Sequence, residues 1–324
     1  MTNIKAMSRT KPYLFLLIST FLLISFVAAE TTAQEGDLSE EVIEQAEEKT
    51  DIELEDPRDL DFEIELRNRL HYLIWYLNGL KGTQDLTAQS VMVNEIDPDG
   101  ESQNILSVGS NRQYPIASLT KLMSSVVARE NLVPEDEVIL NRQMLATYGS
   151  SPALFLGSRV RIEDLVKVSL IQSTNDASEA LARSLPDGKF VELMNNKAQE
   201  IGMENTVFRD AHGLDPENVS TVADISRLKS YISDNHSDIW TITCDDNFRL
   251  PGPQGQLMTF MNLNNRMEWD NFLGGKTGYL PEAGHTYTAL FEIEDRTYSI
   301  TLLKSEDRWE DTQKIKDWLK EDPR

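Results

Sequence analysis

The sequence contains a single cysteine, Cys244, among 324 residues, so no internal disulfide can form and the fold must depend on its apolar core. A hydrophobic content of 40% is enough for such a core, and we expect Cys244 to be a buried apolar filler within it. Histidine is also scarce, and the four histidines include no H-x-x-x-H pair. We therefore predict no metal site and expect His212 and His285 to be structural.

Basic residues are few as well. Lys and Arg number 31 against 54 Asp and Glu, which gives a formal net charge of −23. Such a chain repels nucleic acid and anionic lipid, so neither is an expected partner. Much of the charge is local, because residues 30–65 hold 16 acidic residues against Lys49 and Arg58. That composition buries too little apolar surface to fold, and we predict a disordered acidic tether over residues 30–60, followed by a globular domain over 61–324.

The first 29 residues have the pattern of an export signal. Three basic residues precede the apolar run YLFLLISTFLLISFVAA, which has 17 residues, and small side chains permit cleavage after Ala29. The run is short for a membrane span, which needs about 20 residues. We therefore predict a cleaved signal peptide over 1–29, with an uncleaved anchor through 13–29 as the alternative. Either way, the rest of the chain lies outside the cytoplasm.

Apolar periodicity predicts strands at both ends of the globular domain and helices between them. A first helix is expected over 59–80, then a hairpin of TAQSVMVNEI and NILSVG around the turn DPDG. Helical spacing dominates from about residue 119 to 215 and recurs in STVADISRLKSYIS, before a loop at LPGPQGQ. Two strands, HTYTALFEIE and RTYSITLLK, and the helix WEDTQKIKDWLK follow. A sheet assembled from both ends of the chain around a helical insertion is an α+β fold.

Ser118 and Lys121 lie three residues apart just after Pro115, where an extended segment turns into a helix. One helical turn carries both side chains to the same face, so the amine can take a proton from the hydroxyl. Spacing alone does not identify a site, since SRTK at 8–11 and SRLK at 226–229 share it.

Two further motifs follow at element junctions. Ser173 and Asn175 lie where one predicted helix breaks and the next begins, so a hydroxyl and an amide can point into one cleft. The sequence KTG at 276–278 occurs nowhere else in the chain and precedes a predicted strand. A phosphate-binding loop is excluded there, because that motif needs Gly where this chain has Asp270.

In order and separation these motifs resemble the signature of serine D-alanyl-D-alanine carboxypeptidases, the low-molecular-mass penicillin-binding proteins of peptidase family S11. Blocks similar to the family run from about residue 85 to 320, in the order ASLTKLMS, STNDASEALA, FVELMNNKAQEIGMENTVFRDAHGLD, STVADISRL, GGKTGYLPEAG and SEDRWEDTQ. The resemblance implies a β-lactamase/transpeptidase-like fold, a mostly antiparallel sheet flanked by helices with an inserted helical lobe. Thr174 stands where the family often has Gly. The C-terminal β domain of larger members is expected to be absent, since 46 residues follow Gly278.

The resemblance also implies catalytic roles. Ser118 would be the nucleophile that attacks the carbonyl between two D-alanines and forms an acyl-enzyme. Lys121 would be the general base, provided that burial or a nearby cation such as Lys276 lowers its pKa. Ser173 would relay a proton to the leaving group.

By the same resemblance, substrate would be bound by Asn175, Lys276, Thr277, Gly278, Tyr279 and Arg308. Thr277 and Arg308 would hold the terminal carboxylate, and the backbone N–H groups of Ser118 and Tyr279 would hold the oxyanion. The implied substrates are peptidoglycan pentapeptides or cross-linked muropeptides in the bacterial cell envelope, with β-lactam antibiotics as inhibitors and no cofactor.

Three rival functions remain. The first is a DD-endopeptidase that cuts D-alanyl cross-links. The second is a β-lactamase, which needs a deacylating glutamate, and Glu192 resembles one only superficially because it follows Ser173 by 19 residues within a family-like helix. The third is a catalytically idle penicillin-binding-like protein, against which the intact motifs argue.

Overall fold

The computed structural model describes residues 76–77, 79, 82–149, 154–265 and 267–322. The predicted signal peptide, the acidic tether and most of the predicted first helix lie outside these residues. Within the described part, no helix has the length and apolar character needed to cross a membrane. Residues 78–323 form one compact unit, to which the following description refers.

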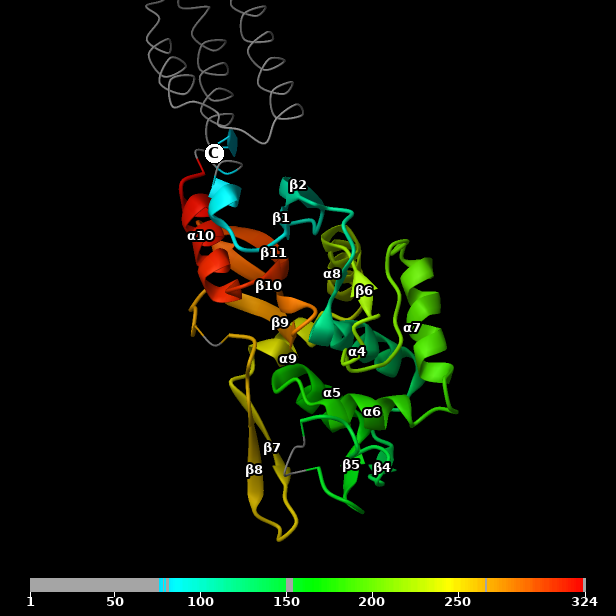
Figure 1. The fold of residues 1–324 in the computed structure, drawn as a ribbon. Coiled ribbons are helices and arrows are strands. Elements are labelled where there is room, and N and C mark those ends of the chain that lie inside the picture. The colour runs from blue at the N-terminus through cyan, green and yellow to red at the C-terminus, as the bar shows by residue number, and fades with distance from the viewer. Residues whose placement is uncertain (1–75, 78, 80–81, 150–153, 266, 323–324) are drawn as a thin grey trace, which may run out of the picture. The chain divides into compact units, whose positions relative to one another are not determined.

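A five-stranded antiparallel sheet forms the centre of this unit, in the order β2-β1-β11-β10-β9 (Figure 1). Its strands are β1 (Ser90–Ile96), β2 (Ser102–Val108), β9 (Phe272–Leu280), β10 (Gly284–Ile293) and β11 (Arg296–Ser305). The first strand from the N-terminal end pairs with the last strand of the chain, so the predicted assembly of the sheet from both ends is confirmed. The predicted hairpin is β1 and β2, which turns at 97–101.

Helices cover both faces of the sheet. On one face α8 (Val222–Asn235) reaches β11 through hydrogen bonds from Lys229 to Ser299 and Thr301. On the other, α10 (Arg308–Lys320) places Trp309 against Tyr287 of β10. Because successive side chains of a strand point to opposite faces, Ser299 and Thr301 belong to one face and their neighbours Tyr298 and Ile300 to the other.

The helical insertion is confirmed (Figure 1). Its helices share one apolar core. It comprises the 3-10 turn η3 (Ala117–Leu119), α4 (Thr120–Asn131), α5 (Ile162–Ile171), α6 (Asn175–Ala182), α7 (Lys189–Glu200), α8 and α9 (Asp238–Cys244). The α4 helix is buried on nearly every side, including Leu122 and Val126, because it runs through the middle of this lobe. Because α4 is buried on nearly every side, its N-terminus is held in place, and Ser118 lies in η3 directly before it.

Small paired strands, none of them predicted, complete the lobe. They are β3 (Tyr114–Pro115) with β6 (Val219–Ser220), β4 (Glu137–Ile139) with β5 (Arg159–Arg161), and β7 (Asn247–Pro251) with β8 (Leu257–Met261). The segment LPGPQGQ is therefore not a simple loop: its first two residues end β7, the rest is the hairpin turn, and β8 begins directly after it. Its prolines and glycines concealed the two strands that flank the turn.

One strand was not predicted, and one expectation is wrong. The sequence KTG precedes the predicted strand HTYTALFEIE, which is β10, but it also lies inside a strand of its own, β9, where Lys276 pairs with Thr288. Glycines are poor strand formers, and neighbouring Gly274 and Gly275 hid this strand. Cys244 is exposed at the end of α9 and is not a buried filler.

Candidate active site

Ser118 lies in η3, on a turn that the surrounding backbone holds in an unusual conformation. The preceding residue, Ala117, has φ +49°, a left-handed conformation that non-glycine residues rarely adopt. Gly213 supports the turn from a neighbouring loop: a Cβ on it would lie 2.0 Å from the carbonyl oxygen of Ala117. On the other side, β9 approaches so closely that a Cβ on Gly278 would lie 2.8 Å from the backbone nitrogen of Ser118. The turn is thus fixed between the loop and the sheet edge.

Lys121 is completely buried beneath this turn and donates three hydrogen bonds. Its Nζ lies 2.8 Å from Ser118 Oγ, 2.8 Å from Asn175 Oδ1 and 2.5 Å from the carbonyl oxygen of His212. Burial lowers the pKa of Lys121 to about 7, although the charge of Asp210 opposes the shift. The neutral amine is therefore accessible near neutral pH, within reach of the Ser118 hydroxyl.

Ser173 occupies the break between α5 and α6 and also has a left-handed backbone, with φ +59°. It accepts a hydrogen bond from Lys276 Nζ at 2.9 Å. Burial lowers the pKa of Lys276 well below its usual value, and the positive charges of Lys121 and Arg308 lower it further. Thr174, the departure from the family pattern, is buried at the N-cap of α6.

The hydroxyl and ammonium groups thus form two linked pairs, Lys121 with Ser118 and Lys276 with Ser173. Asn175 connects the first pair to the exposed residue Tyr148, because its Oδ1 accepts from Lys121 while its Nδ2 donates to the carbonyl oxygen of Tyr148 at 2.7 Å. The three predicted motifs therefore converge in space from η3–α4, the α5–α6 junction and β9.

Arg308 begins α10 and is 8% exposed. Its Nη1 donates to the carbonyl oxygens of Gly278 at 2.7 Å and Thr286 at 2.9 Å, and its Nη2 contacts His285 Nδ1. These contacts brace the end of β9 against β10. Tyr279, one residue beyond Gly278, points to solvent with 57% exposure and its ring lies 4.8 Å from that of His285.

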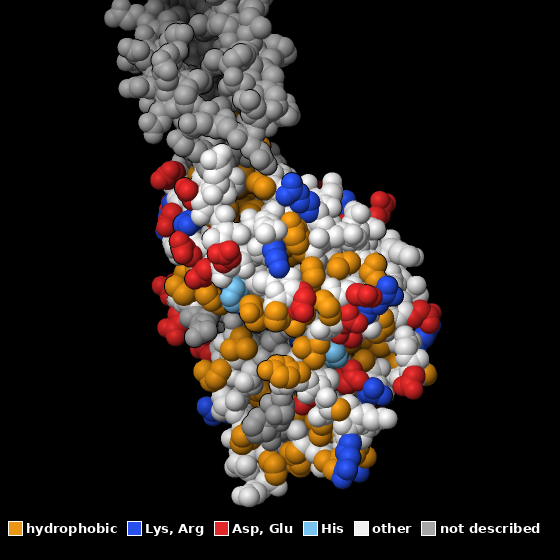
Figure 2. Space-filling view, in the orientation of Figure 1, with side chains coloured by type: hydrophobic (Ala, Val, Ile, Leu, Met, Phe, Trp, Pro, Cys, Tyr) orange, Lys and Arg blue, Asp and Glu red, His pale blue; other side chains and the backbone are white. Residues whose placement is uncertain are grey.

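Exposed apolar side chains are scattered over the surface with charged groups of both signs between them (Figure 2). Tyr148, whose carbonyl oxygen binds Asn175, is 85% exposed and therefore available to contact a bound molecule.

Sequence reasoning missed Asn264, a fully buried residue before β9. Its Oδ1 accepts from Thr277 N at 3.1 Å, Thr277 Oγ1 at 3.3 Å and Lys276 Nζ at 3.4 Å. Its Nδ2 donates to the carbonyl oxygen of Leu170 at 2.8 Å, at the end of α5. The Asn264 side chain thereby connects β9, which carries KTG, to α5, which ends just before Ser173. No spacing rule marks this residue, because its contacts are all to distant backbone and side chains.

Asp210 was also missed. Its carboxylate accepts from the backbone nitrogens of His212, Gly213 and Asp215, which shapes the loop that presents the His212 carbonyl oxygen to Lys121. The residues FRDAHGLD belong to one of the blocks that resemble the family, and three of their backbone N–H groups bind the Asp210 carboxylate.

Glu192, the residue considered for a β-lactamase, lies on α7 with its side chain 57% exposed and paired with Lys189 at 2.8 Å. Glu192 thus forms an ion pair on the surface of the helical lobe.

The fold and the site define the class of active-site serine enzymes that includes penicillin-binding proteins. The family model described as D-alanyl-D-alanine carboxypeptidase, Peptidase_S11, matches residues 79–303. The chain belongs to this family of serine peptidases, which confirms the resemblance noted in the sequence and makes the protein a hydrolase.

Individual relatives agree. A D-alanyl-D-alanine endopeptidase of Pseudomonas aeruginosa is 30% identical over 254 residues, covering 74% of this chain and 80% of that one. The D-alanyl-D-alanine carboxypeptidase DacD of Escherichia coli is 32% identical over 209 residues, covering 59% of this chain and 52% of that one. Among solved structures, penicillin-binding protein D2 of Listeria monocytogenes in its cefotaxime-bound form is 26% identical with a TM-score of 0.62, covering 72% of this chain and 97% of that one.

Proposed function

We propose that this protein is a serine DD-peptidase that removes the terminal D-Ala from D-Ala-D-Ala stem peptides of peptidoglycan through an acyl-enzyme on Ser118. The observation that carries the proposal is the 2.8 Å hydrogen bond from Lys121 to Ser118 Oγ, made by an amine whose burial lowers its pKa to about 7. A base whose pKa lies near the working pH is present in its neutral form and is still basic enough to accept the proton.

In the proposed reaction, Ser118 Oγ attacks the carbonyl carbon of the penultimate D-Ala while its proton passes to neutral Lys121. The C–N bond then breaks, and Ser173 relays a proton to the departing amine. Lys276 donates a hydrogen bond to Ser173 Oγ and thereby orients the hydroxyl of that relay. Water then attacks the ester carbonyl, Ser118 recovers its proton, and the shortened peptide leaves.

We assign substrate binding to the surface between β9 and the N-terminus of α6. The backbone N–H groups of Ser118 and Tyr279 are proposed to hold the oxyanion. Asn175 would bind the peptide amide, and Thr277 with Arg308 would attract the terminal carboxylate. Arg308 acts in this proposal partly through the carbonyl oxygen of Gly278, which it holds in place.

β-Lactam antibiotics are the expected inhibitors, because the similar penicillin-binding protein D2 has been solved with cefotaxime and with ampicillin bound. Peptidoglycan as substrate places the proposed activity in the cell envelope, outside the cytoplasm.

A DD-endopeptidase is the second candidate, favoured by the Pseudomonas aeruginosa relative, 80% of which this chain covers. The two activities use the same acyl-enzyme and differ in the leaving group, which is a free D-Ala in one case and the amine of the second stem, to which the D-alanyl carbonyl was cross-linked, in the other.

The test is digestion of two muropeptides, a monomeric pentapeptide and a D-alanyl cross-linked dimer, followed by mass spectrometry. Loss of one alanine from the monomer identifies a carboxypeptidase, and conversion of the dimer into two monomers identifies an endopeptidase. Ser118→Ala is the control and should abolish either reaction. If neither substrate changes, the proposed function is wrong.

A further inference from the structure

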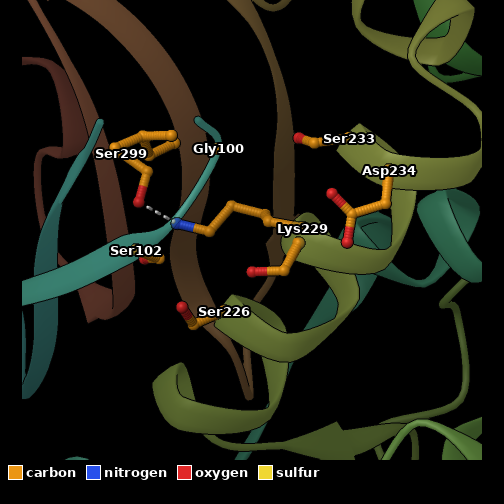
Figure 3. Close-up of a pocket in the computed structure, with 9 residues that line it drawn as sticks. Gly100, Ser102, Ser226, Lys229, Ser233, Asp234 and Ser299 are labelled. Atoms are coloured by element: carbon orange, nitrogen blue, oxygen red, sulfur yellow. Dashed lines mark hydrogen bonds between the residues drawn. The ribbon is translucent and has the colours of Figure 1, made fainter. Parts of the chain in front are cut away.

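Lys229, on α8, is buried away from the active site and lines a small pocket between α8 and the sheet (Figure 3). The pocket has a volume of about 140 Å³, several times the share of one water in the liquid, about 30 Å³. Its lining is rich in serine and comprises Ile96, Gly100, Ser102, Ser226, Lys229, Ser230, Ser233, Asp234 and Ser299. No part of the catalytic arrangement described above lines it.

Lys229 is 3% exposed, and its ammonium group meets only hydroxyls. Its Nζ donates to Ser299 Oγ at 2.8 Å and to Thr301 Oγ1 at 2.9 Å. Lysine carries three donors, so one N–H remains beyond these two bonds. Within the described residues Lys229 has no ion pair with a carboxylate, and burial accordingly lowers its pKa to about 7. A buried cation without a partner is costly, and an anion beside it would remove that cost.

Two hydroxyls that line the pocket each keep a proton available for donation. Ser299 accepts from Lys229, which has only donors to offer, so the Ser299 O–H proton is left for another acceptor. Ser226 accepts from Asn94 Nδ2 at 2.7 Å, which leaves its own proton free in the same way. Two hydroxyl protons and an ammonium N–H therefore converge on one small space, which suits a ligand made of acceptors.

Asp234 narrows the choice of ligand. It lines the pocket and is an exposed residue, and Figure 3 shows Nζ of Lys229 directed toward Ser299 and away from Asp234. A carboxylate at the mouth repels a dianion more strongly than a monoanion.

We propose that this pocket binds a small monovalent oxyanion, a carboxylate or dihydrogen phosphate, with Lys229 as its cation and Ser226 and Ser299 as hydrogen-bond donors. The pocket is separate from the proposed peptidase centre, so a test of anion binding and a test of peptidase activity give independent results.

The experiment measures anion binding to the purified domain by calorimetry below pH 7, where most Lys229 amines are protonated. Sodium phosphate and sodium acetate are tested in separate arms against sodium chloride at equal ionic strength. Lys229→Met removes the cation and keeps the apolar stem. Lys189→Met removes an exposed lysine of α7 and is the matched control. Ser230→Trp fills the pocket mouth from an exposed position on α8 and leaves Lys229 intact.

We expect phosphate, acetate or both to bind the wild type and the Lys189→Met control, with affinity reduced about tenfold or more in Lys229→Met, as for loss of a charged hydrogen bond. Ser230→Trp should lose binding too, and it decides the matter if Lys229→Met does not fold. Binding of phosphate alone indicates a tetrahedral anion and of acetate alone a carboxylate. Equal binding by wild type and Ser230→Trp, or no binding above chloride, overturns the proposal. Acylation by benzylpenicillin, followed in the same variants, should be unchanged and reports on the peptidase centre alone.

Discussion

The turn that carries Ser118 should be sensitive to a single methyl group at Gly213. A Cβ there would lie 2.0 Å from the carbonyl oxygen of Ala117, whereas real contacts stay beyond about 3.0 Å, so the backbone beside Ser118 must move by about 1 Å. A misplacement of that size can cost about 100-fold in rate. We therefore expect Gly213→Ala to acylate with benzylpenicillin about 100-fold more slowly than the wild type.

Gly188→Ala is the matched control. Gly188 has φ +75°, close to the +86° of Gly213, but a Cβ on it would meet open space. Both variants pay the left-handed penalty of about 1 kcal/mol, so urea unfolding should show a loss of about that size in the control and a larger loss in Gly213→Ala. Acylation rates come from intact-mass time courses. A wild-type rate in Gly213→Ala would refute the idea that this close contact positions Ser118.

Three further outcomes follow from the site and its surroundings. Because the neutral form of Lys121 is the base and its pKa is about 7, acylation should rise about tenfold from pH 6 to pH 8 and then level off; a rise that continues to pH 10 would mean an unperturbed lysine. Asn264→Leu leaves Thr277 N without its acceptor and removes one of the three acceptors of Lys276 Nζ, so we expect a loss of about 1–3 kcal/mol in urea unfolding together with slower acylation, and unchanged values of both would contradict the role given to this amide. Asp307 caps α10 through Trp309 N and Glu310 N, and Asp307→Ala should cost about 1 kcal/mol in the same unfolding assay, whereas no loss would argue against the cap.

Local patterns in the sequence were enough to predict the motifs at element junctions. Ser118 and Lys121 share a helical turn, and α5 ends just before Ser173, as periodicity indicated. A sheet assembled from both ends of the chain followed from the strand patterns there, and the structure realises it by pairing β1 with β11. The roles assigned to the site residues stay predictions until they are measured.

Contacts between distant residues could not be predicted. Asn264 acts on β9 and α5 through bonds that no local pattern encodes. The repeated Ser-x-x-Lys spacing makes the same point: Lys121 bonds Ser118, whereas Lys229 passes Ser226 and reaches Ser299 and Thr301 across the sheet. Spacing brings two side chains to one face of a helix, but the neighbouring element determines what they bind.

The most direct test of the central claim is the intact mass of the purified domain over time after mixing with benzylpenicillin, with Ser118→Ala as control. A serine DD-peptidase of the proposed kind should show a penicilloyl adduct that lasts many minutes and is absent from the variant. Drug hydrolysis without an adduct would instead indicate a β-lactamase, and intact drug without an adduct would contradict a working nucleophile at Ser118.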